Sequence, residues 1–262
     1  MDSDLTGKKA VVCGASKGIG RATALELASL GASVTVIARN AAKLEEVKSQ
    51  LDTANGQGHH ALTADFSVPD ALKKVIEGHV STAGPFHILI NNSGGPPAGP
   101  VHTATDDQFL AAFTQHLLGN HIMMQALLPG MRKEGYGRII NVISTSVKVP
   151  LKGLGVSNTI RGAVANWAKT LAGEVAGDGI TVNNVLPGAT ATDRLDEIFE
   201  GKAEKLGKTI DEIIEMEKGH IPAGRFGKPE ELAQAIAFLA SPAGAYINGI
   251  NLPVDGGRTG CL

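Results

Sequence analysis

The stretch Gly14-Ala15-Ser16-Lys17-Gly18-Ile19-Gly20 follows the apolar run Lys9–Cys13 and precedes a segment of helical period. Glycine tolerates positive φ and lets a ligand approach the backbone closely, while the N–H groups at a helix start attract phosphate. Three glycines at this spacing, between a strand and a helix, predict a site for the pyrophosphate of a dinucleotide. The residues expected to contact it are Gly14, Ser16, Lys17, Gly18, Ile19 and Gly20.

Further apolar runs follow this first one, separated by segments of helical period. Because the runs are continuously apolar rather than alternating, both faces of the sheet are expected to be covered, which is typical of parallel strands crossed by helices. We predict a single α/β domain over residues 1–262, built on a doubly wound, seven-stranded parallel sheet. The expected strands are Lys9–Cys13, Ser33–Ala38, His60–Ala64, His87–Asn91, Gly137–Ser144, Thr181–Leu186 and Ile250–Val254. The expected helices are Gly20–Leu30, Ala41–Ala54, Asp70–His79, Thr105–Met131, Asn158–Ala176 and Pro229–Leu239.

Composition narrows the class of protein. Hydrophobic residues make up 43% of the 262 positions and charged residues 19%, and the formal net charge is −2, which excludes a disordered chain or one that coats nucleic acid. No apolar run approaches the ~18 residues of a membrane span, and the first residues contain no signal-peptide core. Cys13 and Cys261 lack metal-ligand spacing, so no metal site is expected. We expect a cytoplasmic protein with small-molecule partners, and neither a membrane nor a nucleic-acid partner.

The end of the second expected strand distinguishes between the two nicotinamide dinucleotides. A protein that binds NAD(H) places an acid there to accept the ribose 2′-hydroxyl, but this chain has Ile37-Ala38-Arg39-Asn40. Arg39 and Lys17 are placed to bind a 2′-phosphate from two sides. One such charge pair at about 4 Å is worth on the order of 4 kcal/mol near a protein surface. The sequence therefore favours NADP(H), with NAD(H) as the less favoured alternative.

Two further strand ends carry candidate cofactor contacts. Asp65, beside Phe66, is placed to accept from an adenine amino group, or else to end the strand or cap the next helix. The turn Asn91-Asn92-Ser93-Gly94 ends the fourth strand at the carboxyl edge, where ligands bind in open sheets. We expect Asn92, Ser93 and Gly94 to contact the cofactor, although the same residues are also typical of an ordinary turn.

In this order the motifs resemble the short-chain dehydrogenase/reductase family over nearly the whole chain. They are the loop 14–20, the turn 91–94, residues 137–141 leading to Ser144, and residues 182–188, 221–231 and 254–257. The resemblance implies a single Rossmann-like domain, a nicotinamide dinucleotide and a homo-oligomer, usually a tetramer. It also implies cofactor contacts from Arg161, Pro187, Gly188, Thr190 and Thr192.

In that family the active site takes an asparagine, a serine, a tyrosine and a lysine. By motif spacing, Ser144 keeps the serine position, whereas Ser157 replaces the tyrosine, Arg161 the lysine and His116 the asparagine. The tyrosine donates a proton to the carbonyl oxygen, because a phenol with a pKa of about 10 becomes more acidic beside an ammonium group. An aliphatic hydroxyl such as that of Ser157 is shorter and far less acidic, and Arg161 keeps the positive charge without cycling a proton.

The missing acid leaves several interpretations open. An ordinary histidine titrates near pH 6.5, so His116 is a candidate proton donor, although a lone helix histidine is more often a packing or surface residue. The segments 146–150 and 157–161 resemble a divergent branch of the family in which Ser-x-x-x-Arg replaces the usual pair. Tyr136 and Tyr246 both precede strands and therefore belong to the opposite, amino edge of the sheet. Neither is expected to compensate.

Residues 193–220 combine many charges with a helical pattern, which predicts either lid helices over a substrate cleft or an ordinary surface hairpin. The expected function is hydride transfer from NADPH to a small carbonyl-type substrate at an atypical site. Two alternatives stay open. One is a catalytically silent NADPH-binding sensor or partner protein, and the other is a reductase of imines, which needs no tyrosine acid.

Overall fold

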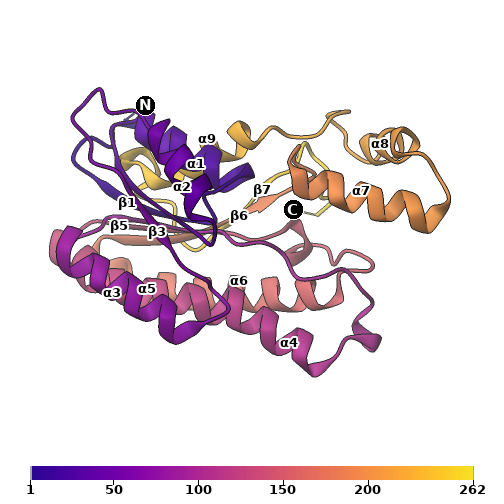
Figure 1. Cartoon of the computed structure of the whole chain (residues 1–262), viewed down its shortest axis with the longest axis horizontal. Coiled ribbons are helices and arrows are strands. Elements are labelled where there is room, and N and C mark those ends of the chain that lie inside the picture. Colours follow the sequence, from indigo (N-terminus) through magenta and orange to yellow (C-terminus); the bar gives the residue numbers. More distant parts are fainter. Residues whose placement is uncertain (1, 262) are drawn as a thin grey trace.

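The computed structural model describes residues 2–261 and shows one layered α/β domain (Figure 1). Within this range, seven parallel strands form one sheet in the order β3-β2-β1-β4-β5-β6-β7, which confirms the predicted Rossmann-like class. The strands are β1 Lys9–Cys13, β2 Ser33–Ala38, β3 His60–Thr63, β4 Ile88–Asn91, β5 Gly137–Val142, β6 Ile180–Pro187 and β7 Asn251–Val254. The strand order reverses beside β1 and β4, and ligands bind at the carboxyl ends of such a switch point.

The helices cover both faces of this sheet. They are α1 Gly18–Ser29, α2 Ala41–Ser49, α3 Pro69–Ala83, α4 Asp106–Ala112, α5 Gly119–Glu134, α6 Gly155–Val175, α7 Asp193–Leu206, α8 Ile210–Lys218 and α9 Pro229–Ala240. Helices α1, α2 and α9 pack on one face, whereas α3, α5 and α6 pack on the other (Figure 1). Within residues 2–261, no helix has the length and apolarity needed to cross a membrane.

Two apolar layers explain why the strands read as continuously apolar. Val12 and Ile90 point into the layer beneath α1 and α9, whereas Val11 and Leu89 point into the layer beneath α5 and α6. All four side chains are fully buried. Successive residues of a strand face opposite sides, so a sheet covered twice requires an apolar residue at nearly every position.

The structure corrects several predicted boundaries. The segment predicted as one helix, Thr105–Met131, is instead α4, a π-helical stretch at Phe113–Leu118, and α5. A π turn inserts one extra residue per turn, so a helical periodicity does not show it, and such turns are frequent at functional sites. The strand predicted to reach Ser144 ends at Val142, because Thr145–Val147 forms a 3₁₀ turn that begins at Ser144.

Three buried asparagines and the half-buried Asn251 form a ladder across the sheet at its carboxyl side. Asn91, Asn141, Asn184 and Asn251 occupy paired positions on β4, β5, β6 and β7. Each Nδ2 donates to the next Oδ1, at 2.9 Å, 2.9 Å and 2.8 Å in that order. Cross-strand side-chain pairs of this kind stabilise sheets. The ladder therefore links the strand ends on which the candidate site is built.

Replacing the centre of the ladder is expected to destabilise the fold. In Asn141→Ala, the amide groups of Asn91 and Asn184 lose their partner while they remain buried, which should lower the free energy of unfolding by about 2–4 kcal/mol. Asn166→Ala, on an exposed position of α6, should change it by less than about 0.5 kcal/mol. Urea unfolding of both variants measures the difference. Equal stability of the two would show that the ladder contributes nothing.

Candidate functional site

The glycine loop between β1 and α1 packs against the end of β4. Gly14 and Gly18 have positive φ, 60° and 56°, which favours glycine. A Cβ on Gly20 would lie 2.2 Å from the Gly14 carbonyl oxygen, and one on Gly14 would lie 2.6 Å from the Asn92 carbonyl oxygen. Asn92 Nδ2 donates to the carbonyl oxygens of Cys13 and Gly14, both at 3.3 Å. Each of these glycines is therefore required for the backbone of the loop 14–20, called the glycine cradle below, to turn tightly against Asn92.

Helix α7 begins directly against this loop. Lys17 Nζ donates to Asp193 Oδ2 at 3.2 Å, and Glu197 Oε1 lies 4.0 Å from the same nitrogen. The hydrogen bond and charge of Lys17 lower the pKa of Asp193. A Cβ on Gly18 would lie 3.3 Å from the Thr192 methyl carbon. The cation that the sequence assigns to a 2′-phosphate is thus paired with the predicted lid.

The other cation and the predicted adenine contact lie on neighbouring strand ends. Arg39 follows β2 and is exposed. Asp65 Oδ1 accepts from the backbone N–H and the hydroxyl of Ser67, at 2.9 Å and 2.7 Å. These bonds, with a smaller effect of Arg39, lower the pKa of Asp65. Asp65 therefore shapes the turn before α3, one of the roles left open by the sequence. Phe66 is buried, with its ring against Gly119.

The π-helical stretch carries His116 into a buried position. Its Nδ1 shares a hydrogen bond of 2.7 Å with Ser93 Oγ, and the side chain is 1% exposed. Its Nε2 is buried with no partner among residues 2–261. Burial, together with the nearby Arg161 charge, lowers the pKa of His116 to about 3. Burial without an acidic partner disfavours the charged ring, which argues against the expected role of His116 as a proton donor at neutral pH.

Arg161 brings a buried positive charge to the same cluster. Its Nη1 donates to the Val142 carbonyl oxygen at 3.2 Å and its Nη2 to the Ser93 carbonyl oxygen at 3.4 Å. No carboxylate of the described chain forms an ion pair with it. Burial lowers the pKa of Arg161 to about 10, so the guanidinium stays charged at neutral pH. This charge is held by carbonyl dipoles at the ends of β4 and β5.

Two serine hydroxyls near this cluster have bonding capacity to spare. Ser144 Oγ accepts from the backbone N–H of Ser146 at 3.1 Å, and no acceptor within residues 2–261 takes its proton. Ser157 is half-buried on α6, one turn before Arg161, and no hydrogen bond from that part of the chain reaches its hydroxyl. Contacts join His116, Ser93 and Arg161 directly, but none joins Ser144 or Ser157 to them. Both serines keep a hydroxyl available for a bound molecule.

The loop after β6 connects the sheet to the hairpin 193–220. A Cβ on Gly188 would lie 2.6 Å from the Asp255 Cα, which requires glycine there. Thr190 Oγ1 donates to the Gly188 carbonyl oxygen and Thr192 Oγ1 to that of Thr190, both at 3.2 Å. Pro187, the last residue of β6, is half-buried. These local bonds direct the chain from the sheet edge back to the glycine loop.

Helices α7 and α8 form a hairpin that projects from the rest of the domain (Figure 1). Glu217 on α8 accepts from Lys202 on α7 and, at 3.1 Å, from Arg258 of the C-terminal segment. These two cations outweigh the effect of burial and lower the pKa of Glu217. The hairpin predicted over residues 193–220 is therefore helical, and one buried carboxylate ties it to the end of the chain.

The two tyrosines lie away from the cluster. Tyr136 OH donates to the Ala240 carbonyl oxygen at 2.8 Å, and the Lys8 and Arg138 cations lie over its ring. Burial raises the pKa of Tyr136. Tyr246 is fully exposed before β7. Neither takes the place of an acid at the carboxyl edge.

Sequence reasoning missed three features of this site: the Ser93–His116 bond, the Lys17–Asp193 pair and the asparagine ladder. The ladder had a usable signal, because each of four consecutive apolar runs contains an asparagine. The Lys17–Asp193 pair joins residues 176 positions apart and had none. The Ser93–His116 bond depends on the π turn, which periodicity does not reveal.

A comparison with protein-family models gives a match over residues 14–259 to the model described as enoyl-(acyl carrier protein) reductase. The chain belongs to the short-chain dehydrogenase/reductase family. The match spans the glycine loop, the Ser93–His116–Arg161 cluster and the hairpin 193–220.

Relatives in this family are similar along nearly their whole length. The 3-oxoacyl-[acyl-carrier-protein] reductase FabG of Pseudomonas aeruginosa is 35% identical over 255 residues, which cover 97% of this chain and 98% of the relative. A crystal structure of L-sorbose reductase from Gluconobacter frateurii, complexed with NADPH and L-sorbose, superposes with a TM-score of 0.93 at 31% identity over 100% of both chains. An NADPH-dependent reductase involved in bacilysin biosynthesis superposes with a TM-score of 0.92 at 30% identity, covering 97% of this chain and 99% of its own.

The buried histidine of this short-chain dehydrogenase/reductase should make stability pH-dependent. Its folded-state pKa of about 3 lies below the ordinary 6.5. The unfolded chain therefore binds this proton first, and stability is lost as the pH falls below the unfolded value. His116→Asn should remove up to about 1.4 kcal/mol per pH unit from the slope between about pH 6 and pH 4. Urea unfolding at several pH values tests this, and parallel profiles of wild type and variant would contradict it.

Proposed function

We propose that this short-chain dehydrogenase/reductase is an NADPH-dependent reductase of a small carbonyl compound that works without a tyrosine acid. The observation that carries the proposal is the glycine loop before α1, which contains Lys17 and lies next to a strand end, that of β2, with Arg39 and no carboxylate. A side chain at Gly14 or Gly20 would clash with Asn92 or with the Gly14 carbonyl, so only glycine lets the backbone turn at these positions, as a pyrophosphate-binding loop at a helix N-terminus requires. The NADPH named in the two similar structures supports the same cofactor.

The Lys17 pairing adds a coupling between cofactor and lid. A 2′-phosphate that recruits Lys17 competes with Asp193 and Glu197 for the same ammonium. Arg39 is exposed and forms no salt bridge within residues 2–261, and the charge of Asp65 affects it only weakly. We therefore assign phosphate binding to Arg39 first, with Lys17 joining as α7 moves. In this scheme the hairpin 193–220 is the substrate lid.

Bound NADPH would supply a hydride to the carbonyl carbon, and the chain's own residues must manage the charge that develops on oxygen. Ser144 has an unused hydroxyl proton to donate to that oxygen. The buried charge of Arg161 favours an alkoxide nearby, because an uncompensated cation is effective where water is excluded. Ser157 relays the proton from solvent, since its hydroxyl is half-buried and unbonded within residues 2–261.

His116 has a positioning role in this proposal. A ring with a pKa of about 3 carries no imidazolium proton at neutral pH. Its bond to Ser93 instead holds the loop after β4, whose backbone also receives Arg161. In this proposal, Ser157 and Arg161 together replace the tyrosine and the lysine of the family pattern, as in the divergent Ser-x-x-x-Arg branch. Arg161 keeps the positive charge of the lysine, whereas the phenol of the tyrosine is lost. Assembly into a homotetramer stays a prediction.

One observation favours a second candidate, the reduction of imines. In the Ser93–His116–Arg161 cluster, the pKa of His116 is about 3 and that of Arg161 about 10, so neither group changes protonation near neutral pH. A protonated imine takes a hydride without needing a proton afterwards, so it suits such a site. A panel of ketones, 3-oxoacyl esters and imines, followed by NADPH oxidation, separates the two reactions. Tight NADPH binding with no turnover on any of them would favour a silent sensor.

The selectivity for NADPH over NADH tests whether Arg39 binds the 2′-phosphate. Arg39→Ala should weaken NADPH binding by about tenfold or more, because a hydrogen-bonded charge pair is worth about 1.5–3 kcal/mol, and should leave NADH binding nearly unchanged. Fluorescence titration of both cofactors measures this. The exposed Arg132→Ala, far from the cradle in an ion pair with Asp178, is the matched control. If Arg39→Ala weakened NADPH and NADH equally, the phosphate assignment would be wrong.

Turnover tests the serine. Ser144→Ala should lower kcat/KM by about 100-fold on the best carbonyl substrate, because one oxyanion donor contributes about that much. NADPH affinity should stay at the wild-type value. Ser49→Ala, an exposed serine at the end of α2, should match the wild type in both measurements. Unchanged turnover in Ser144→Ala would remove this residue from the mechanism.

A further inference from the structure

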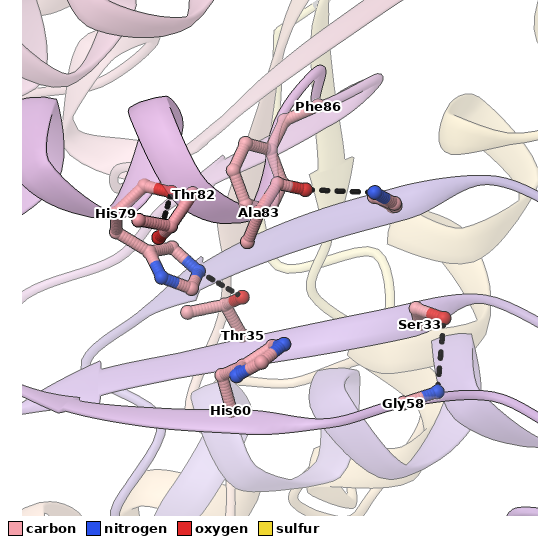
Figure 2. Close-up of a pocket in the computed structure, with 9 residues that line it drawn as sticks. Ser33, Thr35, Gly58, His60, His79, Thr82, Ala83 and Phe86 are labelled. Atoms are coloured by element: carbon pink, nitrogen blue, oxygen red, sulfur yellow. Dashed lines mark hydrogen bonds between the residues drawn. The ribbon is translucent and has the colours of Figure 1, made fainter.

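A second cavity lies at the opposite edge of the sheet from the glycine cradle. It has a volume of about 460 Å³ and opens between α3 and the first residues of β1, β2 and β3 (Figure 2). Lys9, Ser33 and His60 begin these three strands and all line it. The cradle instead follows the last residue of β1. The cavity is therefore separate from the proposed active site, and both can be occupied together.

The lining of this cavity is basic and rich in hydrogen-bond donors. Lys9, His60 and His79 contribute an amine and two imidazoles, and Ser33 and Thr35 contribute hydroxyls. None of its nine lining residues is acidic. A cavity lined by amine, imidazole and hydroxyl donors, with no carboxylate, is complementary to an anion.

Several of these donors are not used by the fold. Lys9 Nζ donates to the Ala83 carbonyl oxygen at 2.7 Å and has two more N–H bonds to offer. His79 Nε2 is bonded to Thr35 Oγ1 at 2.9 Å (Figure 2), whereas no bond within residues 2–261 reaches the ring nitrogens of His60. Ser33 Oγ accepts from the Gly58 N–H at 3.2 Å and keeps its own proton.

Three rings line the cavity in sequence. The His60 and His79 centroids lie 5.0 Å apart in an edge arrangement, and those of His79 and Phe86 lie 5.2 Å apart (Figure 2). These separations are typical of favourable aromatic pairs. A flat ring that packs against them from the cavity would gain similar contacts. The cavity is also several times larger than a simple inorganic anion needs, since its volume falls in the range of sites for small organic ligands.

We propose that this cavity is a second ligand site and that it binds an aromatic carboxylate, with the carboxylate bound by Lys9 and His60 and the ring against His79 and Phe86. The site goes beyond the proposed reductase function and does not depend on it. Its residues lie on β1, β3, α3 and the loop between α3 and β4, and none of them belongs to the glycine loop or the Ser93–His116–Arg161 cluster.

Benzoate is the probe, and calorimetric titration into the protein saturated with NADPH is the measurement. We expect saturable binding of one benzoate, with benzamide and acetate each bound about tenfold more weakly, because the first lacks the charge and the second lacks the ring. Saturating NADPH keeps benzoate out of the cofactor cleft. The titration measures the heat of benzoate binding and does not depend on turnover. Its result would therefore stand even if the protein reduced no carbonyl compound.

Variants locate the bound benzoate. His60→Ala and Lys9→Met should each weaken binding by about tenfold. Lys74→Met, on the exposed side of α3, should match the wild type. His60→Ala is decisive, because this exposed side chain makes no hydrogen bond within residues 2–261 and its loss leaves folding intact, whereas Lys9→Met also frees the Ala83 carbonyl. Equal binding of benzoate and benzamide, no binding at millimolar concentrations, or an unchanged affinity in His60→Ala would overturn the proposal.

Discussion

A single buried guanidinium, that of Arg161, organises the candidate active site. It reaches from α6 to the carbonyl oxygens that end β4 and β5, so one side chain connects a helix to two strands and to the loop that carries Ser93. A buried cation without a carboxylate partner is costly, and only hydrogen bonds to backbone dipoles offset the loss of water. Such a charge is retained at a cost to stability, which is more readily explained by a function at the carboxyl edge than by packing.

The same charge also affects its neighbour His116. Burial, with a smaller contribution from Arg161, keeps the His116 imidazole neutral, so the group proposed to stabilise a developing alkoxide also disfavours His116 as its acid. A phenol beside a lysine serves both purposes in the family pattern, because the cation increases the acidity of the donor. A cation lowers the pKa of an imidazolium as well, but from a value that is already near neutrality, so the ring loses the proton it would donate. In the proposed mechanism, replacing the pair would therefore change the source of the proton and keep a positive charge at the lysine position.

Much of the fold was predictable because apolar runs indicate buried strands and glycines indicate tight turns of the backbone. Lys9–Cys13 and Ser33–Ala38 match the predicted strands at both ends, since a doubly covered strand must be apolar throughout. The π turn at His116 was not predictable, because one inserted residue leaves the composition of the helix unchanged. Phosphate binding by Lys17 stays a prediction, and the sequence did not reveal its pairing with Asp193, which depends on how a distant hairpin returns to the sheet. Local chemistry was readable from the sequence, whereas contacts between distant loops were not.

The ion pair between Lys17 and Asp193 connects the glycine cradle to the hairpin 193–220. Asp193 is the first residue of α7, where a carboxylate also interacts favourably with the helix dipole, so moving Lys17 to a phosphate leaves that carboxylate with a second source of stabilisation. The exchange is therefore less costly for Asp193 than the breaking of an isolated ion pair, and exposed pairs are worth only about 0.2–1 kcal/mol in any case. Glu217 holds the far end of the hairpin through Lys202 and Arg258, and its half-buried network is harder to break. The hairpin 193–220 is consequently held by a partly buried ion-pair network at the C-terminal segment and by an exposed ion pair at the glycine loop, so in the proposed function the contact beside the glycine loop is the one that opens.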